Sequence, residues 1–172
     1  MPKRIEYDFF TWTSFPSSLV MEHPETGYFI RKRLPDIIKV TPRAKLEVRV
    51  NAKARNLEGG SHIWIFAWDG TKWVPLPELV HVPREDREIM TGTYNWTEYS
   101  LYHVAIPEGV TALLIELNAW KGITWWDDLR IFENDKLIYI NRFSNWLPYQ
   151  IAGAVALSIP TALYAIPRLK RR

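Results

Sequence analysis

The sequence predicts an all-β domain, an antiparallel sandwich or barrel, followed by one C-terminal transmembrane helix. Segments in which polar and apolar residues alternate recur about every 8–12 residues, separated by Gly, Pro, Asn and Asp. The 172 residues include 12 prolines and 8 glycines, which suits short strands joined by turns better than long helices. Aromatic residues make up 14% of the chain, and aromatic side chains favour strands.

The expected strands follow one another from the N-terminus to residue 141. The clearest alternation runs over residues 46–54, where every second residue is apolar. Residues 62–68 are apolar on both sides, which is typical of a strand in the centre of a sandwich. Asp69 and Gly70 then form a turn, which predicts a hairpin into residues 72–74. The other expected strands are residues 5–10, 28–34, 37–40, 97–106, 111–119, 125–132 and 136–141.

The C-terminal part of the chain differs from the expected β-domain, which we place at residues 1–143. The 21 residues 147–167 carry no charge, and as a helix they would span roughly the 30 Å hydrocarbon core of a bilayer. We therefore expect the lipid bilayer as a partner. The expected parts are a juxtamembrane linker (144–148), a transmembrane helix (149–167) and a basic tail (168–172). The alternative is a C-terminal helix that lies buried in the protein or on its surface.

The charges around the apolar segment predict its orientation. Arg168, Lys170, Arg171 and Arg172 directly follow it, and the positive-inside rule places such a cluster in the cytoplasm. The β-domain would then be extracytoplasmic. Residues 1–8 are charged and do not resemble a signal peptide, so a cytoplasmic, tail-anchored protein is the alternative.

The composition excludes several classes of function. The chain has no cysteine, which excludes disulfides and thiolate metal sites. Without the four C-terminal cations, 18 of the 22 Lys and Arg remain against 19 Asp and Glu, so the domain lacks the basic balance of a nucleic-acid binder. The four histidines show no metal-binding spacing, and the sequence has no nucleophile elbow or phosphate-binding glycine loop. We expect no enzymatic activity.

A series of motifs between residues 92 and 131 resembles a known family. Gly92-x-x-x-Trp96-x-x-Tyr99 precedes a strand that ends at Pro107, and Trp126-Asp127-Asp128-Leu129 lies in a later strand. Over roughly residues 36–133 the sequence is similar to jelly-roll carbohydrate-binding modules with the galactose-binding-domain-like fold. The resemblance implies an antiparallel jelly-roll β-sandwich that recognises glycans without catalysis, here displayed on a cell or virion surface. The alternative is a structural or interaction subunit of an envelope or membrane complex, with an envelope protein as partner and no sugar binding.

Three tryptophans are the candidate ligand-binding residues. Trp68, Trp73 and Trp120 lie beside turns, where we expect side chains to be exposed. An exposed aromatic ring can stack on the C–H groups of a pyranose face. The alternative is that these tryptophans pack in the core, as most tryptophans of a sandwich do. Trp64 and Trp68 share one face of their strand because side chains repeat with a period of two.

The pair Asp127-Asp128 is the candidate metal site. Side chains of adjacent strand residues point to opposite faces, so we expect the two carboxylates not to share one site. In the family that the sequence resembles, one Asp of this pair often helps to bind a structural calcium ion, and the opening strand often supplies a Glu. The resemblance therefore implies a Ca²⁺ site at Asp128, with Glu6 as a counterpart. The alternative is an Asp that accepts hydrogen bonds from nearby backbone N–H groups.

Overall fold

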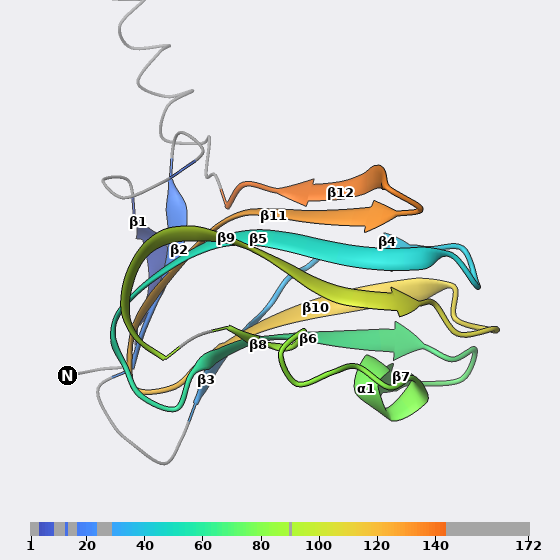
Figure 1. Ribbon diagram of the computed structural model, residues 1–172, viewed down its shortest axis with the longest axis horizontal. Helices are drawn as coiled ribbons and strands as arrows, with labels where there is room; N and C mark the ends of the chain where they lie inside the picture. Colours follow the sequence, from blue (N-terminus) through green and yellow to red (C-terminus); the bar gives the residue numbers. More distant parts are fainter. Residues whose placement is uncertain (1–3, 9–12, 14–16, 24–28, 90, 144–172) are drawn as a thin grey trace, which may run out of the picture.

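The structure is a computed structural model that describes residues 4–8, 13, 17–23, 29–89 and 91–143. The expected linker, transmembrane helix and basic tail lie outside these residues. In the described part of the chain, no helix is long and apolar enough to cross a membrane. The chain forms two antiparallel β-sheets that face each other across one hydrophobic core (Figure 1). The predicted all-β, antiparallel sandwich is therefore confirmed.

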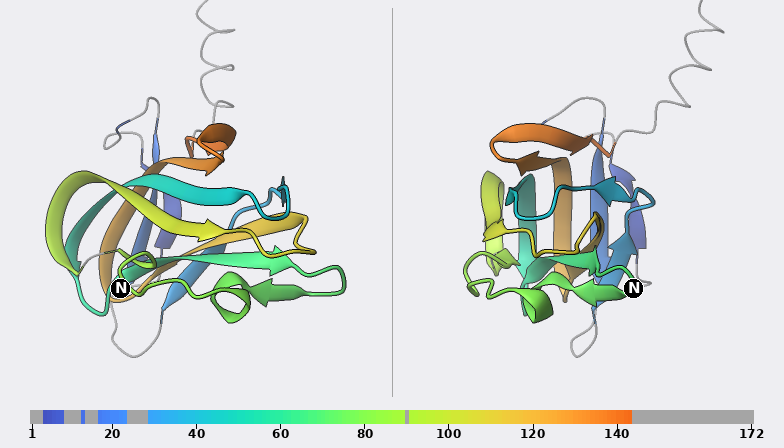
Figure 2. Two further views of the ribbon diagram at one scale, coloured as in Figure 1. Left: turned by 45° about the vertical axis from the view of Figure 1, so that its right-hand side comes forward. Right: turned by 90° about the vertical axis from the view of Figure 1, so that its right-hand side faces the viewer.

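The two sheets are called sheet A and sheet B. Sheet A has the strand order β1-β2-β11-β5-β9, and β12 pairs with β11. Sheet B has the strand order β3-β10-β6-β7; in addition, β4 pairs with β10 and β8 pairs with β6. The strands of sheet A are β1 (Arg4–Asp8), β2 (Ser18–His23), β5 (Lys45–Leu57), β9 (Gly92–Ala105), β11 (Gly122–Glu133) and β12 (Lys136–Asn141). Those of sheet B are β3 (Ile30–Arg33), β4 (Ile38–Lys39), β6 (Ser61–Trp68), β7 (Trp73–Pro75), β8 (Glu88–Ile89) and β10 (Ala112–Ala119). One short helix, α1 (Leu76–Leu79), follows β7, and β12 lies on the opposite side of the molecule from both (Figure 2).

The core lies between the inward faces of the sheets. Alternate residues of β5 in sheet A and of β6 and β10 in sheet B are fully buried. Burying one such aliphatic side chain contributes about 1.5–3 kcal/mol, which offsets much of the conformational entropy lost when the strand becomes ordered. Phe143, the last described residue, is also buried, and the Ser17 hydroxyl donates a hydrogen bond to its carbonyl oxygen (2.8 Å).

The structure corrects two sequence-based expectations. β2 was not expected, because five of its six residues are buried and the segment Ser-Leu-Val-Met-Glu-His shows no clear alternation. It pairs with β1 on one side and β11 on the other. β6 does occupy the centre of sheet B, but its second apolar face is only partly covered by protein, because Trp64 on that face is 42% exposed.

The outward face of sheet A carries several paired charges. Arg49 donates hydrogen bonds to both carboxylate oxygens of Glu47 (2.7 and 3.2 Å), and the Ser100 hydroxyl donates to the same carboxylate. On the same sheet Arg130 pairs with Glu98 and Asp128. The hydrogen bonds from Arg49 lower the pKa of Glu47 to about 2, against a desolvation effect in the opposite direction.

This lowered pKa predicts that Glu47 stabilises the fold in a pH-dependent way. In the unfolded chain the carboxyl group titrates near 4.5, so its contribution is complete above that pH and is lost as the pH falls toward 2. We expect Glu47→Gln to reduce the free energy of unfolding by about 2 kcal/mol at pH 6, since partial exposure of Arg49 screens the pair. Urea unfolding of both proteins at pH 6 and pH 3 measures this difference, which should shrink by more than half at pH 3. An equal difference at both values would contradict the assignment.

Candidate functional site

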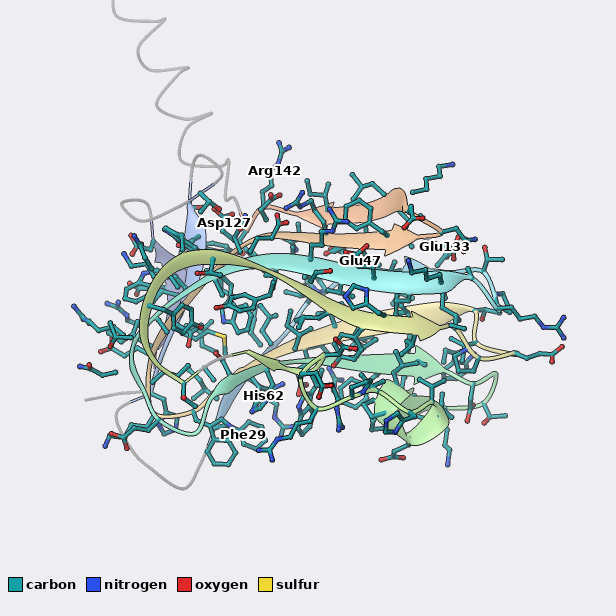
Figure 3. All side chains as sticks on the ribbon, viewed as in Figure 1. Phe29, Glu47, His62, Asp127, Glu133 and Arg142 are labelled. Atoms are coloured by element: carbon teal, nitrogen blue, oxygen red, sulfur yellow. The ribbon has the colours of Figure 1, made fainter. Side chains whose placement is uncertain are left out.

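The outward face of sheet B is aromatic, in contrast to that of sheet A. In β6 the residues Ile63, Ile65 and Ala67 point into the core, so the residues between them point away from it. These outward residues are His62, Trp64, Phe66 and Trp68. In Figure 3, Phe29 and His62 lie on the sheet B side of the molecule, while Glu47 and Asp127 lie on the sheet A side.

Four rings form a continuous row, which we call the aromatic strip: Trp120, Phe29, Trp64 and Phe66. The ring of Phe29 lies 5.6 Å from that of Trp120 and 5.9 Å from that of Trp64, and the rings of Trp64 and Phe66 are 6.3 Å apart. Gly59 has a φ of +82°, and a Cβ there would lie 3.1 Å from the Trp120 ring. A larger residue at this turn would therefore crowd the Trp120 ring, whereas glycine leaves room for it.

A hollow of about 700 Å³ adjoins the aromatic strip. Along this edge, β6 pairs with β7 through residues 66–68 and with β8 through residues 61 and 62, so residues 63–65 pair with neither strand. Tyr102 of β9 fills part of this gap, and its hydroxyl donates a hydrogen bond to the carbonyl oxygen of Ile63. The α1 region and the turn before β8 supply Glu78, Arg84 and Arg87 to the lining.

Buried polar side chains of β10 lie beside the strip on the same sheet face. Glu116 is opposite Trp64 and Asn118 is opposite His62, and each is only 1% exposed. Asn118 lines the hollow. Within the described residues, Oδ1 of Asn118 and Oε1 of Glu116 have no hydrogen-bond partner. An unsatisfied buried acceptor costs about 1–3 kcal/mol, so both atoms favour a ligand that donates hydrogen bonds.

Two arginines of β3 border this row. The Arg33 guanidinium lies 3.3 Å from Oε2 of Glu116, and that of Arg31 lies 4.0 Å from Oε1. Arg31 also lies over the ring of Phe29 and Arg33 over the ring of Phe66, each at 5.7 Å from the ring centroid. The face thus combines apolar ring surface, buried acceptors and cationic donors.

The structure separates the three tryptophans that the sequence suggested. Trp120 lines the hollow, whereas Trp68 and Trp73 pack on each other at 5.5 Å at the other end of β6. All three are half-buried. Their role in binding stays a prediction. Sequence reasoning missed Phe29, Trp64 and Asn118; the period of two, which put Trp64 on the face of Trp68, was the available signal for Trp64.

The structure also shows where the candidate metal ligands lie. Asp127 is 0% exposed and accepts hydrogen bonds from the backbone N–H and hydroxyl of Thr13 and from the N–H of Asp128. Asp128 has a φ of +49° and pairs with Arg130 at 3.3 Å. The β5–β11 register shifts between Asp127 and Arg130, so a bulge interrupts the regular alternation of β11 at this pair. The two carboxylates have different partners, Thr13 for Asp127 and Arg130 for Asp128.

Glu6 lies on β1, pairs with Arg4 at 3.1 Å, and is separated from β11 by β2. The described residues contain no group of three or more His, Asp or Glu side chains that could hold a metal ion. The carboxylate that braces the backbone is Asp127, and the calcium site at Asp128 stays a prediction.

Comparisons with known proteins give the fold a wider context. No protein-family model matches the sequence, and no curated protein matches it. Among solved structures, the enzymatically active domain of tailspike protein 4 of bacteriophage CBA120 aligns with a TM-score of 0.56 and 15% identity over 76% of this chain. The CBM22-1–GH10 modules of a Clostridium thermocellum endo-1,4-β-D-xylanase, complexed with xylohexaose, align with a TM-score of 0.51 and 10% identity over 76% of this chain.

The aligned parts cover only 18% of the tailspike chain and 24% of the xylanase chain. A family 16 carbohydrate-binding module aligns with a TM-score of 0.50 and 6% identity, over 75% of this chain and 85% of that module. Identities this low establish the fold alone. The chain has the jelly-roll β-sandwich fold of carbohydrate-binding modules.

Proposed function

We propose that this domain is a non-catalytic module that binds glycans on the outward face of sheet B. The observation that carries the proposal is the partly exposed aromatic strip beside a hollow with buried hydrogen-bond acceptors. The fold supports it, because the similar structures include carbohydrate-binding modules and one of them is complexed with xylohexaose.

The chemistry of the face suits a sugar. A pyranose has an apolar C–H face that stacks on aromatic rings and hydroxyl groups that donate hydrogen bonds around its edge. Trp64 and Phe29 offer the rings, and Oδ1 of Asn118 offers an acceptor that has no partner within the described residues. A hydroxyl bound to Oδ1 would remove the cost of that unsatisfied atom, which gives the ligand affinity and orientation together.

Calorimetric titration of the full-length protein with a panel of hexasaccharides tests this proposal. The panel includes xylohexaose, mannohexaose, cellohexaose and acidic oligosaccharides, in a polyoxyethylene detergent that has no sugar headgroup. Saturable binding of at least one of them is expected. If none binds, the aromatic strip is not a glycan site, and the alternative, an interaction surface for an envelope protein, becomes the better explanation.

We further propose that residues 149–167 anchor this module in a membrane, with the β-domain on the extracytoplasmic side. The support is the charge-free segment followed by a basic tail. We expect the full-length chain to stay in the membrane fraction after alkaline carbonate extraction, because an integral helix resists conditions that release peripheral proteins. The chain ending at Phe143 serves as the control and should be released. Release of the full-length chain would contradict the anchor.

A further inference from the structure

We infer that the hollow selects glycans that carry a carboxylate, such as uronic acids, and that Arg87 binds the acidic group. The inference rests on the proposed glycan binding and specifies the class of sugar. Its basis is an arginine without a counter-charge in the wall of the hollow, next to the aromatic strip.

The first observation is the state of the Arg87 side chain. Among the side chains that the structure describes, the buried Nε atom of Arg87 has no hydrogen-bond partner and no carboxylate is paired with Arg87. Its backbone is fixed, because the N–H of Arg87 donates to the carbonyl oxygen of Arg84 (3.0 Å). The carbonyl oxygen of Asp86 in the same turn accepts a hydrogen bond from the N–H of Tyr102 (3.3 Å). A partly buried cation is costly until an anion pairs with it.

The second observation is that Tyr102 does not neutralise Arg87. Burial raises the pKa of the Tyr102 phenol, and the nearby positive charge of Arg87 only partly opposes this effect. The phenol therefore stays neutral, and its proton is donated to the carbonyl oxygen of Ile63. The hollow thus holds no phenolate that could serve as a counter-charge.

The third observation is an excess of positive charge on this face. The lining of the hollow includes Arg84 and Arg87 but one carboxylate, Glu78. Beside it, Arg31 and Arg33 share the single carboxylate of Glu116. On sheet A, Arg49 and Arg130 each have at least one carboxylate of their own. Because arginines outnumber carboxylates around the hollow, this part of sheet B attracts anions.

The geometry suits a sugar acid better than a free anion. The guanidinium group is planar and can donate two parallel hydrogen bonds to one carboxylate. A uronic acid carries its carboxylate on the pyranose ring itself, so a ring held against Trp64 or Trp120 could present this group to the wall of the hollow. Asn118 is neutral and nearly fully buried, and its Oδ1 can accept a hydrogen bond from a hydroxyl of the same ring.

The experiment compares matched ligands in which a methyl ester replaces each carboxylate and so removes its charge. The full-length protein is titrated with hexagalacturonate and a hyaluronan hexasaccharide, and with the methyl ester of each, in the polyoxyethylene detergent. We expect an acid to bind at least tenfold more tightly than its ester at low salt, a preference that falls as salt screens the charges. Arg87→Gln should reduce the preference to about twofold, while Arg87→Lys, which keeps the charge but not the paired donors, should retain part of it.

Arg142→Gln is the matched control, because Arg142 is exposed and lies on the sheet A side of the molecule (Figure 3). This variant should keep the full preference for the acid over its methyl ester. Thermal melts check that all variants are folded. Equal binding of acid and ester, or binding of neutral oligosaccharides only, would overturn the inference and leave the proposed function standing. A preference that survives Arg87→Gln would overturn the role of Arg87. Failure of every oligosaccharide to bind would reject the proposed function itself.

Discussion

Replacing Trp64 by Ala is expected to weaken glycan binding by at least tenfold while leaving the fold intact. Trp64 is one of the two inner rings of the aromatic strip, with Phe29 on one side and Phe66 on the other. Tryptophans at the centre of a binding surface often contribute 2 kcal/mol or more, which corresponds to about a 30-fold change in affinity. Because the side chain is already 42% exposed, its removal should cost little stability. Calorimetric titration and a thermal melt measure the two effects.

Trp125→Ala is the control for removing a tryptophan. Trp125 lies on sheet A, where its Nε1 donates to Asp8 (2.8 Å) and Lys53 lies 5.4 Å from its ring. This variant should lose some stability but keep full glycan affinity. If both variants bind the sugar as well as the parent protein does, the binding face is not the outward face of sheet B.

Asp127→Ala is expected to lower the free energy of unfolding by about 3 kcal/mol, the largest effect on stability among the variants proposed. The carboxylate is fully buried and accepts hydrogen bonds from the Thr13 N–H (2.7 Å), the Thr13 hydroxyl (2.9 Å) and the Asp128 N–H (2.7 Å). Its removal leaves these donors without their acceptor, at about 1–3 kcal/mol for each that water does not reach. It also releases Thr13 from β11, 114 residues away in the sequence.

Asp128→Asn is the control for Asp127→Ala, because asparagine tolerates the positive φ at this position better than alanine does. The Asp128 carboxylate is half-buried and pairs with Arg130, and Arg130 keeps Glu98 as a second carboxylate partner when Asp128 is replaced, so we expect a loss of about 1 kcal/mol. Urea unfolding of the two variants should therefore differ by at least 2 kcal/mol. Equal losses would show that the hydrogen bonds to Asp127 do not brace the bulge.

The sequence alone was sufficient to predict the strands that have one buried face and one solvent-exposed face. In β5, apolar and polar residues alternate; the structure buries the apolar set and leaves the polar set, apart from Glu47, at least partly exposed. The same period correctly grouped Trp64 with Trp68 on one face of β6. These inferences succeed because the pleat of a strand is a local property of the backbone. Where both faces are buried, as in β2, the local pattern disappears and the strand is missed.

Only the tertiary structure decided where the candidate site lies. Two apolar faces on β6 predicted a strand covered on both sides, yet nothing in the local sequence says which face another sheet covers. Phe29 meets Trp120, about 90 residues away in the sequence, only because β3 pairs with β10. The bulge at Asp127 and Asp128 depends likewise on the register with β5. Periodicity thus determines which side chains share a face, whereas the packing of distant strands determines which face meets solvent and which rings meet each other.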